Sequence, residues 1–324
     1  MFENFKRLSF RHKNNKAWYY FRNHVRRYLP SVIFQKRLEH KLASIKDFDA
    51  DYIQKRVDYY NRLEEVHELS DKAESISNLL HHPKLSVYHF DTYEYMRYFK
   101  QNLKALFVFG DVIHVPEEPS IVKSRPINGD IANSVVLKLE KLRHFLFLND
   151  KKSFQSKKNM MVGRNKAKQP HRIKFLEMYF NHPMCNIGQV NRDVNPQFIG
   201  SRMTITEHLD YKFILCLEGW DVASNLKWVM SSNSLAVMTK PIYETWFMEG
   251  TLIPNYHYVL IKDDYSDLEE RLNYYIEHTE EALKIIENAH DYQKQFKNKK
   301  QEDLISLLVL KKYFEKTKQE NNEE

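Results

Sequence analysis

Glycine is scarce in this sequence. Only seven glycines occur among 324 residues, and no two of them lie within ten positions of each other. The dinucleotide fingerprint G-x-G-x-x-G and the P-loop both need closely spaced glycines. The motifs G-x-S-x-G and H-E-x-x-H are also missing. A dinucleotide-dependent dehydrogenase and a P-loop nucleotide hydrolase are therefore disfavoured.

Cysteine and long apolar segments are scarce as well. Cys185 and Cys216 have no metal-binding or redox spacing, so both are predicted to be buried thiols. No apolar run approaches the roughly 18 residues that a membrane span needs. The start, MFENFKRLSF, lacks the apolar core of a secretory signal. These features predict a protein of the reducing cytoplasm, or one bound peripherally at the inner face of the cytoplasmic membrane.

Acidic residues are nearly missing from the first 46 positions. This arm carries twelve Lys and Arg against Glu3 and Glu39, a formal charge of +10 within a total of +7. Aromatic residues interleave with the cations, as in Trp18 to Arg22. The arm suits adsorption to anionic lipid, but a solvated helix that packs its aromatics inward is equally consistent. A nucleic-acid arm is a weaker alternative because no recognised fold motif accompanies the charge.

Several short apolar runs indicate an α/β protein. Each has strand length and no helical period; they are residues 104–110, 160–162, 213–217, 235–238 and 257–261. Helices are expected from Pro170, through Leu226 and Val229, and from Asp267. Another is expected from Asn133 or Ser134, with apolar positions 136, 139, 142 and 145. Ligands of such sheets bind at the carboxyl ends of the strands.

The chain is expected to contain two lobes. Residues 1–80 form a basic helical segment, broken at Pro30 and joined to a first lobe at 81–155. The basic connector 149–158 marks the lobe boundary, and a second lobe covers 156–290. Residues 291–324 supply a helix that returns to the first lobe, with a charged tail.

A D-x-D pattern occurs at Asp47 to Asp51. In one transferase fold this pattern holds a metal ion after an apolar strand. Here it follows a basic segment and opens a polar helix, so helix capping explains it better.

The stretch 217–261 resembles the CAP10-type glycosyltransferases of family 90, in particular their bacterial lipopolysaccharide branch. The family pattern runs S-x-R-L-K-Y, then G-S, an aromatic and acidic loop, and L-x-P-x-x-H-Y. The matching residues are Leu226-Lys227-Trp228, Ser234, Glu244 to Phe247, Leu252, Pro254 and His257-Tyr258. The family arginine falls on Asn225 and the family glycine on Asn233.

The resemblance implies a GT-B fold, with two Rossmann-like lobes around a cleft, and an inverting, metal-independent transferase. The donor would be a UDP-sugar carrying glucose or galactose, and the acceptor a lipopolysaccharide inner-core sugar such as heptose. No cofactor besides this co-substrate, no metal and no nucleic acid are expected. Two alternatives stay open: a non-catalytic module that binds anionic polymer or membrane through the arm, and a sugar-phosphate transferase of the same envelope pathway.

Asp111 matches the family's strand-end aspartate and is the expected general base; a simple turn cap is the alternative. The expected donor-binding residues are Lys158, Gly163, Arg164, Asn165, Asp221, Ser224, Asn225, Lys227, Glu244, Glu249 and His257. Lys123 and Arg125 are expected to bind an acidic acceptor. The alternative for Lys227, Glu244, Glu249, Lys123 and Arg125 is a solvated surface group, and that for His257 is a core histidine.

Overall fold

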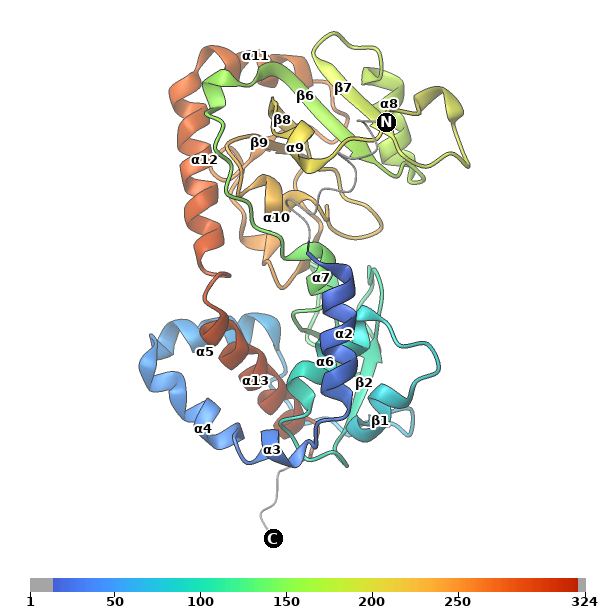
Figure 1. The fold of residues 1–324 in the computed structure, drawn as a ribbon, viewed down its shortest axis with the longest axis vertical. Coiled ribbons are helices and arrows are strands. Elements are labelled where there is room, and N and C mark those ends of the chain that lie inside the picture. Colours follow the sequence, from blue (N-terminus) through green and yellow to red (C-terminus); the bar gives the residue numbers. More distant parts are fainter. Residues whose placement is uncertain (1–13, 320–324) are drawn as a thin grey trace. The chain divides into compact units, whose positions relative to one another are not determined.

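The structure is a computed structural model that describes residues 14–319. These residues divide into two compact units. The parallel-sheet unit comprises residues 143–241 and 251–295. The mixed-sheet unit comprises residues 15–142, 242–250 and 296–319 (Figure 1).

The parallel-sheet unit contains one five-stranded sheet in which every pairing is parallel. Its strands are β6 (Lys158–Asn165), β7 (Cys185–Gln189), β8 (Tyr211–Leu215), β9 (Leu235–Met238) and β11 (Val259–Leu260). In space they follow the order β7-β6-β8-β9-β11. The chain therefore turns in opposite directions after β6 and β8, and this switch point is where sheets of this order bind ligands.

Helices connect and cover this sheet (Figure 1). They are α8 (Pro170–Tyr179), α9 (Ile205–His208), α10 (Leu226–Val229), α11 (Leu268–Glu277) and α12 (Thr279–Lys294), with 3-10 turns η3 (Phe154–Ser156) and η4 (Pro196–Phe198). Pro170 occupies the first turn of α8, as predicted. The strands supply a core around Phe213, Leu235 and Val237, all with no exposed surface. Both cysteines are free and buried, which confirms that prediction.

The mixed-sheet unit contains two small sheets. One joins β1 (Glu74–Ser75), β2 (Lys104–Val108), β3 (Ser120–Val122) and β5 (Ser134–Val136) in that order, and all but β1 run parallel. The other pairs β4 (Ser124–Pro126) with β10 (Tyr243–Thr245) in antiparallel register. Between β2 and β5 the chain runs through β3, β4 and loops, without a helix. This connection differs from the strand-helix-strand units of a Rossmann fold.

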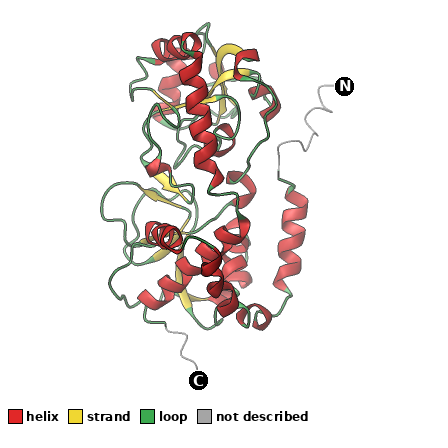
Figure 2. Cartoon of the chain, turned by 90° about the vertical axis from the view of Figure 1, so that its left-hand side faces the viewer, coloured by secondary structure: helices red, strands yellow, loops and turns green. Residues whose placement is uncertain are grey.

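Helices make up much of the mixed-sheet unit (Figure 2). They are α2 (Lys16–Arg27), α3 (Val32–Gln35), α4 (Leu38–Ala43), α5 (Ala50–Tyr60), α6 (Val87–Met96) and α13 (Lys299–Lys316), with 3-10 turns η1 (Ser44–Asp47) and η2 (Ile76–His81). Helix α13 packs against α4, α5 and α6. The short elements α7 (Lys141–His144) and η5 (Glu249–Thr251) lie where the chain passes from one unit to the other.

Two local predictions have opposite outcomes. Asp49 accepts a hydrogen bond from the backbone N–H of Tyr52 at 3.0 Å, so the D-x-D segment caps α5 as expected. The helix expected from Asn133 or Ser134 is wrong, because Ser134–Val136 forms β5 and pairs with β3. Its β-branched residues Val135 and Val136 fit a buried strand better than a helix.

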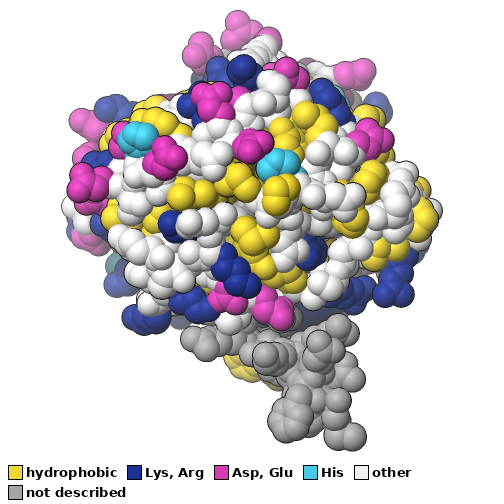
Figure 3. Space-filling view, turned by 90° about the horizontal axis from the view of Figure 1, so that it is seen from above, with side chains coloured by type: hydrophobic (Ala, Val, Ile, Leu, Met, Phe, Trp, Pro, Cys, Tyr) yellow, Lys and Arg dark blue, Asp and Glu magenta, His cyan; other side chains and the backbone are white. Residues whose placement is uncertain are grey.

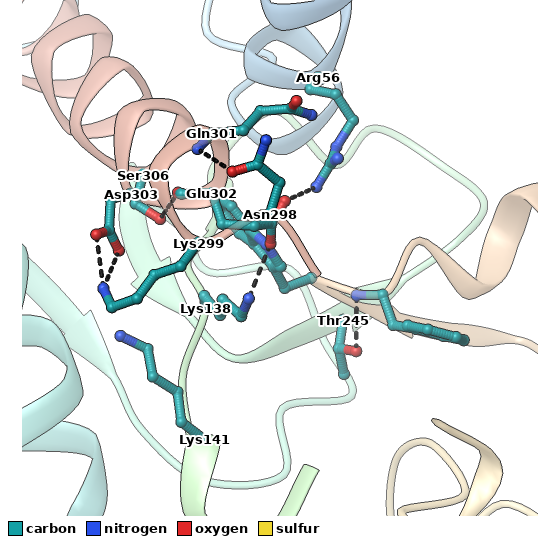
Figure 4. A network of polar contacts seen from close by, with 12 residues as sticks. Arg56, Lys138, Lys141, Thr245, Asn298, Lys299, Gln301, Glu302, Asp303 and Ser306 are labelled. Carbon is teal, nitrogen blue, oxygen red and sulfur yellow. Dashed lines mark hydrogen bonds and ion pairs between the residues drawn. The ribbon is translucent and has the colours of Figure 1, made fainter. Parts of the chain in front are cut away.

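A buried ionic network holds α5, α13 and the segment after β10 together (Figure 4). The Glu302 carboxylate accepts from Arg56 at 3.0 Å and Lys138 at 2.9 Å, and from the Trp246 indole N–H at 2.6 Å. Burial works to raise the pKa of Glu302, but the two cations hold it below its ordinary value. Within residues 14–319, no helix is both long and apolar enough to cross a bilayer.

Candidate active site

The loops that follow β6 and β8 meet at the switch point of the parallel sheet, and Arg172 of α8 joins them. Its donor nitrogens reach main-chain carbonyl oxygens on both loops. The acceptors are Leu217 (2.7 Å), Glu218 (2.7 Å) and Lys166 (2.8 Å). Burial lowers the pKa of Arg172 to about 10. Carbonyl oxygens orient this guanidinium, and the carboxylates of Glu218 and Asp221 act to raise its pKa. A positive charge is therefore held in a fixed position at the edge where sheets of this kind bind ligands.

Arg164, near the carboxyl end of β6, is also held by carbonyl oxygens. Its guanidinium donates to the carbonyl oxygens of Ser201 (2.6 Å) and Asn186 (2.7 Å) and to the Asn186 side chain (2.6 Å). Burial lowers the pKa of Arg164. It therefore braces β7 and the loop near Ser201, and contributes to a donor site through its charge more than through a free N–H. Gly163 is needed for packing, because a Cβ there would lie 3.0 Å from Leu215.

The segment between β8 and β9 brings together several predicted residues. Asn225 donates to the carbonyl oxygen of Leu215 at 2.9 Å, which ties the start of α10 to the end of β8. Ser224 precedes it and is half-buried, and Asp221 is buried. Lys227 has no exposed surface, so the solvent-facing alternative for this lysine is wrong. Helix α10 is a single turn, so its dipole contributes little here.

Three other predicted residues have separate positions. Asn165 ends β6 at the carboxyl edge, where its carbonyl oxygen accepts from Val190. Lys158 begins β6 and is therefore at the opposite edge of the sheet, with its ammonium 5.0 Å from the Tyr211 ring centre. Its predicted contact with a diphosphate at the carboxyl edge is thus wrong. His257 is buried, accepts from the Ile253 N–H at 2.9 Å and has a pKa lowered by burial, as expected of a core histidine.

A hollow of about 520 Å³ lies beyond the carboxyl end of β7. Arg192 and Arg202 line it, and both are exposed. These two arginines and Arg172 were not predicted from the sequence. Their positions become meaningful only when the strand order places the ends of β6, β7 and β8 at one edge. In the sequence, the start of α8 at Pro170-His171-Arg172 was the one local pattern that pointed to these arginines.

In the mixed-sheet unit, Asp111 follows the carboxyl end of β2. The turn uses Gly110 at φ +118°, a conformation that favours glycine. The Asp111 carboxylate is 2.5 Å from the Lys123 ammonium, and its side chain is 34% exposed whereas that of Lys123 is 1% exposed. Glu140 lies 3.5 Å from the same ammonium. One carboxylate oxygen of Asp111 is thus held by a buried lysine, while the side chain is still partly exposed to solvent.

The structure corrects the prediction for Lys123 and Arg125. Lys123 supports Asp111 from the interior and does not face an acceptor. Arg125 has no exposed surface, and its guanidinium is 2.8 Å from Glu244. The antiparallel register of β4 and β10 places Arg125 directly opposite Glu244. The two side chains therefore pair with each other in the interior and do not face an acceptor.

The predicted ribose contacts of Glu244 and Glu249 are wrong for the same reason. Both carboxylates are 1% exposed and belong to the mixed-sheet unit. Glu244 accepts from Arg125 and from the Tyr59 hydroxyl. Glu249 accepts from the backbone N–H and the hydroxyl of Thr245, at 2.6 and 2.9 Å. Their hydrogen bonds stabilise the interior and leave no side chain for a ligand.

Comparison with known proteins defines the class of protein. Residues 146–322 match the family model of glycosyl transferase family 90. The chain is also 43% identical over 265 residues to an O-glucosyltransferase LpsA of Dichelobacter nodosus, covering 81% of this chain and 82% of that relative. The chain therefore belongs to glycosyl transferase family 90, and the resemblance found in the sequence is confirmed. It is a transferase enzyme with a sugar donor and an acceptor as substrates.

Proposed function

We propose that the protein is an inverting, metal-independent hexosyltransferase of the GT-B class. It would move glucose or galactose from a UDP-sugar to a lipopolysaccharide inner-core sugar, with heptose as the accepting unit. Family membership supports sugar transfer, and the relative's name supports glucose and an oxygen acceptor. The observation that carries the mechanism is Asp111, clamped by Lys123 yet one-third exposed.

The proposed reaction is a direct displacement. The acceptor hydroxyl oxygen attacks the anomeric carbon of the donor, while Asp111 takes the hydroxyl proton. The bond from the anomeric carbon to the diphosphate oxygen breaks, and its electron pair leaves with UDP. The two substrates must be held in line for this step.

The leaving diphosphate needs positive charge that is already in position. The carboxyl edge of the parallel sheet supplies Arg164 and Arg172, each oriented by carbonyl oxygens. Arg192 and Arg202 add two exposed guanidinium groups. We assign the donor to this edge, and buried Lys227 remains a candidate there.

Replacing Asp111 by Asn tests the base. General-base catalysis contributes about 10²–10⁴-fold, so Asp111→Asn should lower kcat by a factor in that range. The dissociation constant for the UDP-sugar should stay within about twofold, because the arginines of the donor edge are unchanged. Asp71→Asn, at an exposed position of the same unit, is the matched control. Full turnover by Asp111→Asn would show that another group takes the proton.

A donor screen tests the nucleotide and the sugar. UDP-glucose, UDP-galactose and the corresponding GDP- and ADP-sugars should be compared by thermal unfolding. A ligand present at about 100 times its Kd adds about 2.7 kcal/mol of stability. Stabilisation by the UDP-sugars with activity retained in EDTA supports the proposal. Activity that requires a divalent cation would instead favour a sugar-phosphate transferase.

A further inference from the structure

Helix α2 turns an apolar stripe toward solvent. The exposed fractions are 58% for Trp18, 59% for Phe21, 47% for Val25 and 43% for Leu29. Trp18, Phe21 and Val25 lie in α2, where their spacing of three and four residues places them on one face, and Leu29 follows just after the helix. Large apolar side chains on a single helix face are normally covered, and a continuous exposed group indicates a binding surface.

The opposite face of α2 is firmly packed. Tyr19 is buried in a cluster with Leu80 and Phe90, and its hydroxyl donates to Asp91 at 2.6 Å. Arg26 forms an ion pair with Glu94 at 3.0 Å. The stripe is therefore presented by an anchored helix, which Figure 1 labels α2.

The apolar surface continues past the helix. Tyr28, Val32 and Ile33 are also exposed. Of the eighteen exposed large apolar residues in the part of the chain that the structure describes, seven thus lie between positions 18 and 33. We call these seven residues the α2 stripe.

The stripe lies within a strongly basic segment. Residues 14–46 carry eight Lys and Arg against Glu39, a formal charge of +7. Exposed Lys16, Lys36 and Arg37 precede or follow the stripe. By contrast, the face of the molecule in Figure 3 intersperses acidic and basic side chains around scattered apolar ones.

We propose that the α2 stripe binds the surface of a bilayer that contains anionic phospholipids. Aromatic and aliphatic side chains enter the headgroup region, and the flanking cations contact the lipid phosphates. A nucleic acid would use the cations but leave the stripe uncovered, because its affinity comes from phosphate contacts. A second copy of the chain would bring two segments of like charge together. The inference concerns where the enzyme works and does not depend on which sugar it transfers.

Vesicle binding by the full chain tests this inference. Sedimentation with phosphatidylcholine vesicles should show little binding, and adding phosphatidylglycerol should raise it. The double variant Trp18→Ser/Phe21→Ser should lower the partition coefficient about tenfold or more, because it removes two of the inserted aromatic rings. Each of Lys16→Gln and Lys36→Gln should lower it about fivefold, less at high salt. All of these side chains are exposed, so thermal unfolding should match that of the wild type.

Val66→Ser/Met178→Ser is the matched control, since both residues are exposed and lie outside the stripe. Its vesicle binding should stay within about twofold of the wild type. Equal binding by the stripe variant and the wild type would overturn the inference. So would binding to duplex DNA without vesicle binding, or a dimer that the stripe variant abolishes. Transfer to a soluble acceptor sugar should be unchanged in the stripe variant, which separates this test from that of the proposed function.

Discussion

The half-buried arginines at the carboxyl edge of the parallel sheet have different partners from the cations inside the mixed-sheet unit. In the parallel-sheet unit, Arg164 and Arg172 donate to carbonyl oxygens at the ends of strands. In the mixed-sheet unit, the cations form ion pairs with carboxylates, as Arg125 does with Glu244 and as Arg56 and Lys138 do with Glu302. The first arrangement holds arginines at an edge by carbonyl oxygens, and the second places carboxylates directly beside the cations in the interior.

This difference matches what each substrate of a sugar transferase requires. A nucleotide diphosphate is attracted by fixed cations, which also stabilise it as it leaves. An acceptor hydroxyl needs a carboxylate, and the mixed-sheet unit provides Asp111 on a buried lysine. The comparison therefore supports a donor at the parallel sheet and a base in the mixed-sheet unit.

The largest effect on stability is expected at Glu302, because this one buried carboxylate pairs with two cations. Glu302→Gln leaves Arg56 and Lys138 buried without their anion. Breaking a buried ionic group in this way costs about 3–5 kcal/mol. Chemical unfolding should therefore show a loss of that size for Glu302→Gln.

Glu315→Gln on the same helix is the control, because the Glu315 side chain is 52% exposed and pairs with Lys311 on the surface. It should change the unfolding free energy by about 1 kcal/mol or less. Similar losses in both variants would mean that the Glu302 network is no more important than a surface pair.

Arg172 provides a smaller and more specific test. A lysine there can reach one carbonyl oxygen but cannot span both loops. Arg172→Lys loses about two of the hydrogen bonds that hold its charge between the two loops. Because the positive charge is then less well positioned for a diphosphate, UDP affinity should fall about tenfold in titration calorimetry. Arg271→Lys, on α11 of the same unit, should leave the affinity within about twofold. An unchanged affinity in Arg172→Lys would place the donor away from this edge.

Strands with a continuous apolar run were predictable from the sequence. Residues 235–238 form β9 with the predicted ends, and residues 213–217 overlap β8 closely. These strands are buried on both faces, so their sequence shows no alternation. The strand at residues 134–136 was harder to predict, because the apolar residues at every third position from 136 also fit a helix. Pairing with β3 decides their structure, and no local pattern reports that pairing.

The charged candidates were harder to assign than the strands. Arg125 and Glu244 are 119 positions apart, so the sequence could not reveal that they neutralise each other. Both were therefore expected to bind substrate. Asp111 was expected as the base through the family resemblance, and the structure places it after the carboxyl end of β2, as the sequence indicated. Arg172 became visible as a bridge only when the order β7-β6-β8 brought two loops together.

The smallest expected effect is the loss of stability at low pH that results from the buried His257 ring of the parallel-sheet unit. Burial lowers the pKa of His257, whose ring nitrogen accepts from the Ile253 N–H. The unfolded chain therefore binds more protons than the folded chain below pH about 6.5, and stability falls as the pH falls through that value. At pH 5.5 one such histidine costs at most about 1.4 kcal/mol.

His257→Asn replaces the accepting ring nitrogen by an amide oxygen that also accepts but cannot be protonated. Its melting temperature should therefore fall less between pH 7.5 and pH 5.5 than that of the wild type. His40→Asn, at an exposed position of α4, should follow the wild type. If His257→Asn shows the full wild-type loss, the acid sensitivity of the protein has another origin.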